Sequence, residues 1–184
     1  MENEELLILL ANDENVSTTI DILNNAYEIK KQIRKNFLEK LRKECESYNY
    51  KLEYDDKILG YETDSWIHIS DETYNGVEFC IGLEKRMGEQ GGCYMFFQLT
   101  NGKQIDKKNR RMYWTRDEGA SEPTAEMPLG KLYLYGPNNE DWWNWDNLET
   151  LRSMANGEIL KYIKEQLEKI KNENVFKELY EKSI

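Results

Sequence analysis

The sequence contains little histidine and little cysteine, and each scarcity excludes a class of site. His68 is the single histidine, so a His-rich zinc site cannot form and a Ser-His-Asp triad would have to use this one imidazole. The three cysteines, Cys45, Cys80 and Cys93, form no CxxC pair, and their odd number and wide spacing do not indicate a disulfide framework. We therefore expect a reducing, cytoplasmic setting and predict neither a metal nor a cofactor.

Long apolar runs and nucleotide-binding or hydrolase motifs are also missing. The longest apolar run, residues 6–11, is far shorter than the roughly 20 residues of a bilayer span, and acidic side chains rather than a basic leader precede it. No GxxxxGK[ST], GxGxxG, GxSxG or HExxH motif occurs. The formal net charge of −10 disfavours bare nucleic acid and anionic membranes as partners. The expectation is a soluble protein that is not exported.

The 184 residues are predicted to form a single α+β domain, residues 1–184, because a chain of this length buries roughly 70% of its unfolded surface. Residues 1–49 are expected to be helical, and their apolar stripe should face a core or a partner. Residues 146–180 are predicted to return to helix, with Asp146 and Glu149 as an N-terminal cap, a stop at Gly157 and a longer helix after it. The residues of the N-terminal stripe are Ile22, Ala26, Ile29, Ile33, Phe37 and Leu41.

Residues 50–136 alternate apolar and polar side chains, which is typical of strands. The strongest expected strands are 65–69, 77–83, 93–99, 111–115 and 131–135. In the second of these, Val77, Phe79, Ile81 and Leu83 share one face, as in a sheet covered on one side. Short Asn-Gly and Gly-Gly turns favour an antiparallel sheet of five to six strands, flanked by the N-terminal helices and a C-terminal helix pair.

Acidic side chains concentrate in residues 53–72, where seven of them stand against Lys57 alone. If the loops that carry Asp55, Asp56, Asp64 and Asp71 gather on one face, they would form a negative surface suited to a basic protein partner. The simpler alternative is that solvent-exposed charge keeps these loops soluble.

A basic segment, residues 103–116, opposes this trend, with six cations against Asp106. Cations beside an aromatic ring can bind phosphates and stack a base. The candidates for such a nucleic-acid contact are Lys107, Lys108, Arg110, Arg111 and Trp114. Pairing of these cations with the acidic loops is the alternative that the negative net charge favours.

Three tryptophans, Trp142, Trp143 and Trp145, lie within four residues. They cannot all point the same way, so at least one should pack on the sheet while another could anchor a protein partner. Core packing is the simpler interpretation, because large aromatic side chains usually bury most of their area.

No catalytic constellation is evident. His68 alternates with Ile67 and Ile69, which is typical of a hydrogen-bonded structural histidine, and Cys80 and Cys93 lie in strand patterns where inert buried thiols are usual. Carboxylates are so abundant that any pair of them is weak support for a metal site.

The pattern of residues 22–41, Trp66, the run GVEFCIGL at residues 76–83 and the closing helices at 148–170 resembles the C-terminal, non-catalytic portion of bacterial PD-(D/E)XK-superfamily nuclease-like proteins. Catalysis in that family needs a strand bearing a (D/E)xK triplet that holds a metal. The three such triplets here, at residues 28–30, 55–57 and 106–108, lie outside convincing strand patterns. The resemblance therefore implies kinship with nucleases without nuclease activity.

Together these features predict a binding protein of bacterial or phage origin that engages and modulates a protein partner with a basic surface. Nucleases and CRISPR effectors are such partners, so an anti-restriction, anti-CRISPR or antitoxin-like inhibitor is the expected class. The alternative is a nucleic-acid-binding accessory module that uses the basic segment.

Overall fold

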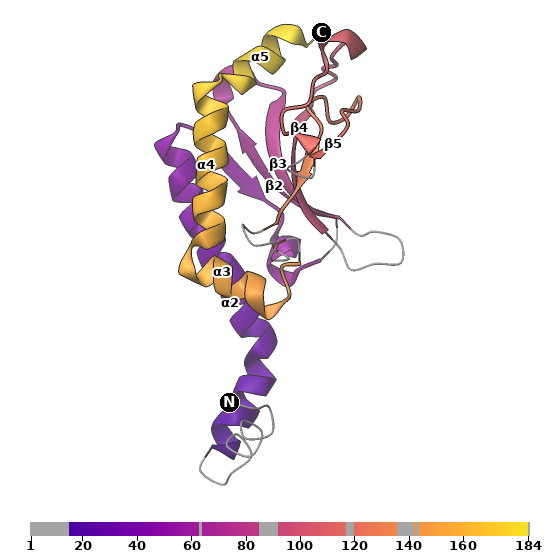
Figure 1. Cartoon of the computed structure of the whole chain (residues 1–184). Coiled ribbons are helices and arrows are strands. Elements are labelled where there is room, and N and C mark those ends of the chain that lie inside the picture. The colour runs from indigo at the N-terminus through magenta and orange to yellow at the C-terminus, as the bar shows by residue number, and fades with distance from the viewer. Residues whose placement is uncertain are drawn as a thin grey trace.

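The chain folds as a six-stranded antiparallel sheet with its described α-helices on one side, as the computed structural model shows (Figure 1). The structure describes residues 15–62, 64–84, 92–116, 120–135, 142 and 144–183. The strand order is β1-β2-β3-β4-β6-β5. The predicted α+β class, with helices at both ends of the chain and an antiparallel sheet between them, is confirmed.

The sheet consists of β1 (Lys51–Tyr54), β2 (Ser65–Ser70), β3 (Val77–Glu84), β4 (Gly92–Leu99), β5 (Ala120–Ser121) and β6 (Lys131–Tyr133). Along β3 the inner face carries four buried apolar side chains, Val77, Phe79, Ile81 and Leu83. These belong to the main core under the helices, as the alternation in the sequence predicts.

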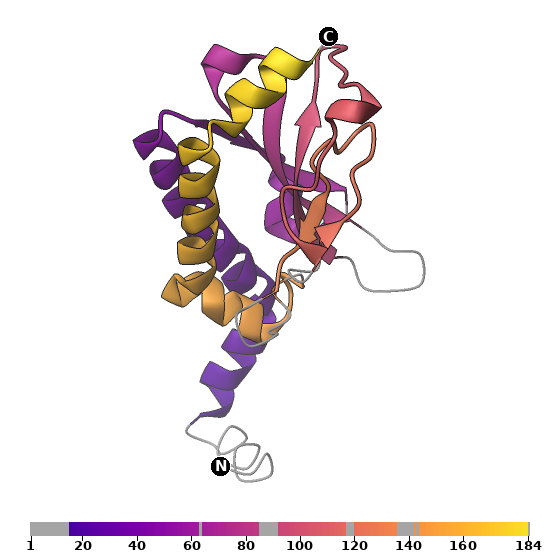
Figure 2. The same ribbon diagram turned by 45° about the horizontal axis from the view of Figure 1, so that its top comes forward.

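The helical layer contains α2 (Val16–Ser47), α3 (Leu148–Asn156), α4 (Glu158–Asn172) and α5 (Val175–Lys182). Turning the molecule shows α2 and α4 side by side on the same face of the sheet (Figure 2). Phe37, Leu38 and Leu41 of α2 pack into the core with Ile163 and Leu167 of α4, so the two longest described helices close the core from outside.

Three local features differ from expectation. Residues 111–115 form no strand, although the amides of Arg111 and Tyr113 donate to the carbonyls of Pro128 and Leu129. These two bonds fall on adjacent carbonyls rather than on alternate residues, and the Gly130 amide donates to the Met127 carbonyl at 3.0 Å, so no regular ladder forms. The expected C-terminal helix pair is followed by a third helix, α5, because Asn174 adopts a left-handed conformation (φ 53°) that separates α5 from α4.

The cap of α3 is the third difference. The side chain of Asn147, rather than Asp146, accepts a hydrogen bond from the Thr150 amide at 2.7 Å. Asp146 is turned instead toward α2, where it meets Lys30 and Arg34. Gly157 ends α3 in a left-handed conformation (φ 89°), as expected for a helix C-terminus.

Arg34 fastens α2 to the body of the domain. Its side chain is 1% exposed, and its guanidinium donates to the Leu59 carbonyl at 2.7 Å, to the Asp146 carboxylate at 3.0 Å and to the Trp145 carbonyl at 3.4 Å. The ring of Tyr61 lies 5.8 Å from the guanidinium carbon, measured to its centroid. A single α2 side chain thus ties together the segments that follow β1 and precede α3.

Candidate functional site

The outer face of the sheet, opposite the helices, is chemically divided. Strand pairing aligns Glu78 with Gln98, His68 with Cys80, and Trp66 with Gly82. Because side chains alternate along a strand, these three pairs form successive rows on one face. Polar and metal-ligating groups occupy the first two rows, and aromatic side chains gather around the third.

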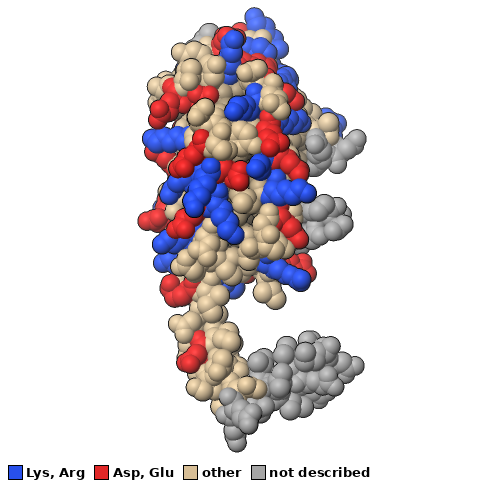
Figure 3. Space-filling model, turned by 90° about the vertical axis from the view of Figure 1, so that its left-hand side faces the viewer, with Lys and Arg blue, Asp and Glu red and all other residues tan. Residues whose placement is uncertain are grey.

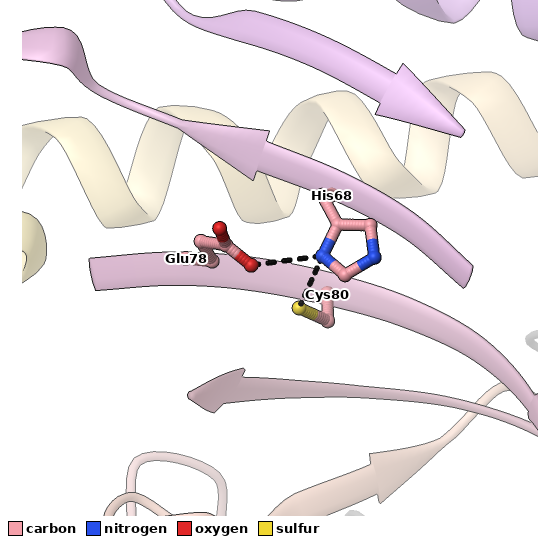
Figure 4. Close-up of side chains that lie close together, drawn as sticks. All are labelled: His68, Glu78 and Cys80. Atoms are coloured by element: carbon pink, nitrogen blue, oxygen red, sulfur yellow. Dashed lines mark hydrogen bonds and ion pairs between the residues drawn. The ribbon is translucent and has the colours of Figure 1, made fainter. Parts of the chain in front are cut away.

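The polar part contains a compact cluster of His68, Glu78 and Cys80 (Figure 4). The His68 Nδ1 lies 2.8 Å from a Glu78 carboxylate oxygen and 3.7 Å from the Cys80 Sγ. The Gln98 amide donates to the same Glu78 oxygen at 2.7 Å. One ligating atom from each of the three clustered residues lies within 4.8 Å of the other two.

The position of the cluster on β2 and β3 determines how readily the Cys80 thiol ionises and how exposed His68 and Glu78 are. Burial raises the pKa of the Cys80 thiol well above its ordinary value, and the neighbouring Glu78 carboxylate raises it further. The thiol is therefore protonated at neutral pH when no cation is nearby. His68 and Glu78 are part-buried, with side chains 37% and 25% exposed, and both can be reached from solvent.

The aromatic part of the outer face is built around Gly82. A Cβ at this position would lie 2.0 Å from the nearest atom of the Trp66 ring, so only glycine lets that ring cross β3. Trp66 makes edge contacts with Tyr94 and Phe96, at centroid separations of 5.9 and 5.5 Å. The Lys131 ammonium lies 4.5 Å from the centroid of the Tyr94 ring. These contacts cover the sheet beside the cluster with packed aromatic rings.

Sequence reasoning identified His68 and Cys80 as isolated structural residues and missed that they meet. The signal available was the pair of alternating runs at residues 65–70 and 77–84. The connection between these strands contains the 3-10 turn η2 (Glu72–Tyr74), and its length, which alternation does not reveal, sets the register that pairs His68 with Cys80.

A second candidate site is the N-terminal half of α2, which extends beyond the rest of the described chain (Figures 1 and 2). Its exposed large apolar side chains include Leu23, at 69%, and Ile20, at 50%. Few charges accompany them in this part of the helix (Figure 3). The full set of exposed large apolar residues here is Val16, Ile20, Ile22, Leu23, Tyr27 and Ile29.

One row of this exposed surface continues directly into the core. Val16, Ile20, Leu23 and Tyr27 follow one another at spacings of four, three and four residues, which places them on one side of the helix. Seven residues after Tyr27 the same row reaches the buried Arg34, and then Phe37 and Leu41 of the core. The expected apolar stripe is also part core and part open surface, since Phe37 and Leu41 are buried whereas Ile22 and Ile29 are exposed.

The acidic candidates do not gather on one face. Asp55, Asp56 and Asp64 lie where β1 ends and β2 begins, whereas Asp71 follows the other end of β2, some 20 Å away for a strand of six residues. Asp55 and Asp71 also cap short helical turns, accepting from the amides of Lys57 and Thr73, both at 2.9 Å. Asp71 therefore does not share an acidic surface with Asp55, Asp56 and Asp64.

Two of the tryptophan candidates, Trp142 and Trp145, are part of the core. Trp145 is 0% exposed and packs edge-on against Phe37 at a centroid distance of 5.6 Å, and Trp142 is buried against Tyr162 of α4. Trp145 cannot anchor a partner without opening the core, whereas Trp142 also lines a surface hollow of about 290 Å³ with Tyr135 and Tyr162, so a contact of Trp142 with a partner stays a prediction. Trp143 lies outside the described residues.

The basic segment is largely engaged within the molecule. Arg111 makes a two-pronged contact with the Glu178 carboxylate at 3.1 and 2.8 Å, and the buried ring of Trp114 donates to Gln166 of α4 at 3.0 Å. Because its ring is buried, Trp114 cannot stack a base, and the expectation that it contacts nucleic acid in this way is wrong. Lys107 and Lys108 remain exposed, and Arg110 is half-buried beside the carbonyl of Ile105.

Within the described part of the chain, no helix is both long and apolar enough to cross a bilayer. The resemblance to PD-(D/E)XK nuclease-like proteins remains a prediction. A scan against protein-family models, a search of curated proteins and a search of solved structures each found no match to this chain.

Proposed function

We propose that this chain is a binding protein that engages a protein partner through the projecting half of α2, and that the partner offers an apolar groove rimmed by basic side chains. The observation that carries the proposal is the open apolar surface on α2. Water-exposed leucine and isoleucine side chains in such density are typical of interaction sites rather than of a free surface.

The shape of this surface favours a groove over a flat contact. The exposed side chains from Val16 to Ile29 cover about half of the helix circumference, which is wider than the narrow seam of a two-stranded coiled coil. Residues 16–29 also extend for only about 21 Å. A groove that surrounds the helix buries more of its surface than a single helix laid alongside it, as in other helix-in-groove complexes.

The electrostatic part of the proposal comes from the acidic residues near the base of this helix. The 3-10 turn η1 (Asp56–Gly60) packs against α2, and the Leu59 carbonyl accepts from Arg34. Exposed Asp55, Asp56 and Asp64 therefore lie at the end of the sheet from which α2 projects. They would attract a basic rim and accelerate association. Enzymes that process nucleic acid carry such basic surfaces, which makes them the partner class we propose.

The experiment compares variants of the full chain in capture from lysate of the cells that express it, with the captured proteins identified by mass spectrometry. Leu23→Glu should reduce recovery of the specific partner at least tenfold, because it places a charge at the centre of the apolar row. Asn25→Glu, which places the same charge on the side of the helix opposite the row of Val16, Ile20, Leu23 and Tyr27, should retain it. With the purified partner, Asp55→Lys with Asp56→Lys should slow association and weaken its dependence on salt.

Three results would contradict the proposal. One is a partner that binds the Leu23→Glu variant as well as the wild type. Another is a concentration-dependent dimer in sedimentation that Leu23→Glu abolishes, since the occupant would then be a second copy of this chain. The third concerns the fluorescence of a probe that binds exposed apolar surface. If the wild type gives a weaker signal than a chain lacking residues 1–14, those residues cover the helix.

A further inference from the structure

We propose that His68, Glu78 and Cys80 form a zinc site on the outer face of the sheet, with three protein ligands and a fourth position open to solvent. The site is independent of the surface on α2, because it lies on the face of the sheet opposite the helices. Its donors are one imidazole nitrogen, one carboxylate oxygen and one thiol sulfur.

The choice of metal follows from these donors. Nitrogen, oxygen and sulfur in combination suit Zn²⁺, which all three ligand types bind in tetrahedral sites. Mg²⁺ and Ca²⁺ require several oxygen ligands, and the cluster supplies one carboxylate. Ionised Cys80 and Glu78 would together balance the two charges of the zinc ion, and the thiol proton would pass to solvent.

The distances are close to those of a coordinated zinc ion. Bond lengths of about 2.0–2.1 Å to nitrogen or oxygen and about 2.3 Å to sulfur give tetrahedral edges of about 3.3 Å between nitrogen and oxygen and about 3.6 Å between nitrogen and sulfur. The His68 Nδ1 to Cys80 Sγ distance is 3.7 Å. The His68 Nδ1 to Glu78 distance of 2.8 Å is that of a hydrogen bond and needs to lengthen by about half an ångström, which a rotation of the glutamate side chain can supply.

The scaffold holds these ligands firmly. His68 and Cys80 are directly paired across β2 and β3, and Glu78 is two residues from Cys80 on the same face of β3. Gln98 of β4 orients the carboxylate through its 2.7 Å hydrogen bond. Ligands on adjacent strands of a packed sheet keep their separation, and a hydrogen-bonded neighbour that fixes a ligating carboxylate is a usual part of a metal site.

Solvent reaches the cluster from the outer face, because the side chains of His68 and Glu78 are 37% and 25% exposed. Glu78 lines a surface hollow of about 310 Å³ together with Lys51, Ser70 and Gly76. Glu53 of the edge strand β1 lies opposite His68 in the strand register and forms an ion pair with Lys51 at 2.8 Å. A water molecule or a small ligand can therefore complete the tetrahedron from the polar side of the outer face.

The test uses the full chain, reduced and freed of metal by a chelator, titrated with Zn²⁺ in competition with a chromophoric chelator. We expect one zinc ion per chain. Glu78→Gln and His68→Asn should each weaken zinc affinity at least tenfold, since even residues that only orient a ligand contribute that much. Circular dichroism of both variants establishes that they fold.

Substitution with Co²⁺ identifies the sulfur ligand. The wild-type protein should show a thiolate-to-cobalt charge-transfer band, which Cys80→Ala should remove and Cys93→Ala, a change at a buried thiol on the inner face, should leave. Unchanged zinc affinity in folded Glu78→Gln and His68→Asn would overturn the site. A charge-transfer band that persists in Cys80→Ala would equally overturn it, as would the absence of stoichiometric binding by the wild type.

Discussion

The Arg34 guanidinium lies 3.0 Å from the carboxylate of Asp146, a residue 112 positions later in the chain. Lys30 donates to the other oxygen of the same carboxylate, also at 3.0 Å. Burial alone would raise the pKa of Asp146, but the hydrogen bonds from Lys30 and Arg34 outweigh it and lower the pKa. This contact marks the point along α2 where the buried part of the helix begins.

Removing the Asp146 carboxylate should leave the buried Arg34 guanidinium without its ionic partner. We expect Asp146→Ala to lower the free energy of unfolding by about 1–2 kcal/mol, because the buried Arg34 loses its ionic partner while the 46% exposure of the Asp146 side chain keeps the figure modest. Urea unfolding at neutral pH measures the change. Glu28→Ala, at an exposed acidic position on the same helix, should stay within about 0.5 kcal/mol of wild type. Equal losses in the two variants would show that the contact contributes nothing specific.

The N-cap of α3 can be tested at one position. Asn147→Ala should cost about 1 kcal/mol of stability, because the Thr150 amide loses the acceptor that now lies 2.7 Å away. Asn147→Asp keeps a capping oxygen and should remain within a few tenths of a kcal/mol of wild type. Thermal unfolding of the two variants side by side distinguishes them, and an aspartate variant as unstable as the alanine variant would argue against capping.

Gly82→Ala should destabilise the sheet by about 1–3 kcal/mol, because the added methyl group would overlap the Trp66 ring. The near-ultraviolet circular dichroism of the aromatic cluster should change with it. A double-mutant cycle with Trp66→Leu provides the control, since the glycine substitution should cost much less once the ring is gone. Additive losses would mean that the backbone at Gly82, rather than the indole, resists the change.

Acid should weaken the contact between α5 and the basic segment. Hydrogen bonds from Arg111, aided by Lys182, lower the pKa of Glu178 from 4.5 to about 2 even though burial opposes them. A depressed folded-state pKa stabilises the protein above the unfolded-state value, so this contribution is complete above about pH 5 and declines as the pH falls from about 4.5 toward 2.

The matching variant is Glu178→Gln. At pH 6 its free energy of unfolding should be about 1–2 kcal/mol lower than that of the wild type. The figure is modest because the Arg111 side chain is 41% exposed. Near pH 3 the difference should shrink substantially. Denaturant midpoints across this range measure it, and a difference independent of pH would assign the loss to packing instead of charge.

Alternation along 77–83 and helical spacing along 22–41 were sufficient to predict the sheet, its buried face and the long helix, because both periods express the local direction of side chains. The strand predicted at 111–115 did not form, because the amides of Arg111 and Tyr113 donate to the adjacent carbonyls of Pro128 and Leu129 instead of to alternate residues of a paired strand. Strand predictions from alternation assume a partner, and a single sequence does not reveal which segment that partner is.

The sequence by itself determined the class of fold, the covering of the sheet on one face only and the small number of histidine and cysteine side chains, since these follow from composition and short-range periodicity. The tertiary structure alone decided which apolar residues stay in water, which acids share an end of the sheet, and that His68 meets Cys80. Leu23 and Leu41 look alike in the sequence, yet Leu23 is exposed and Leu41 is buried. The difference arises because α2 is longer than the layer it packs against, and only the packed chain fixes where that layer ends.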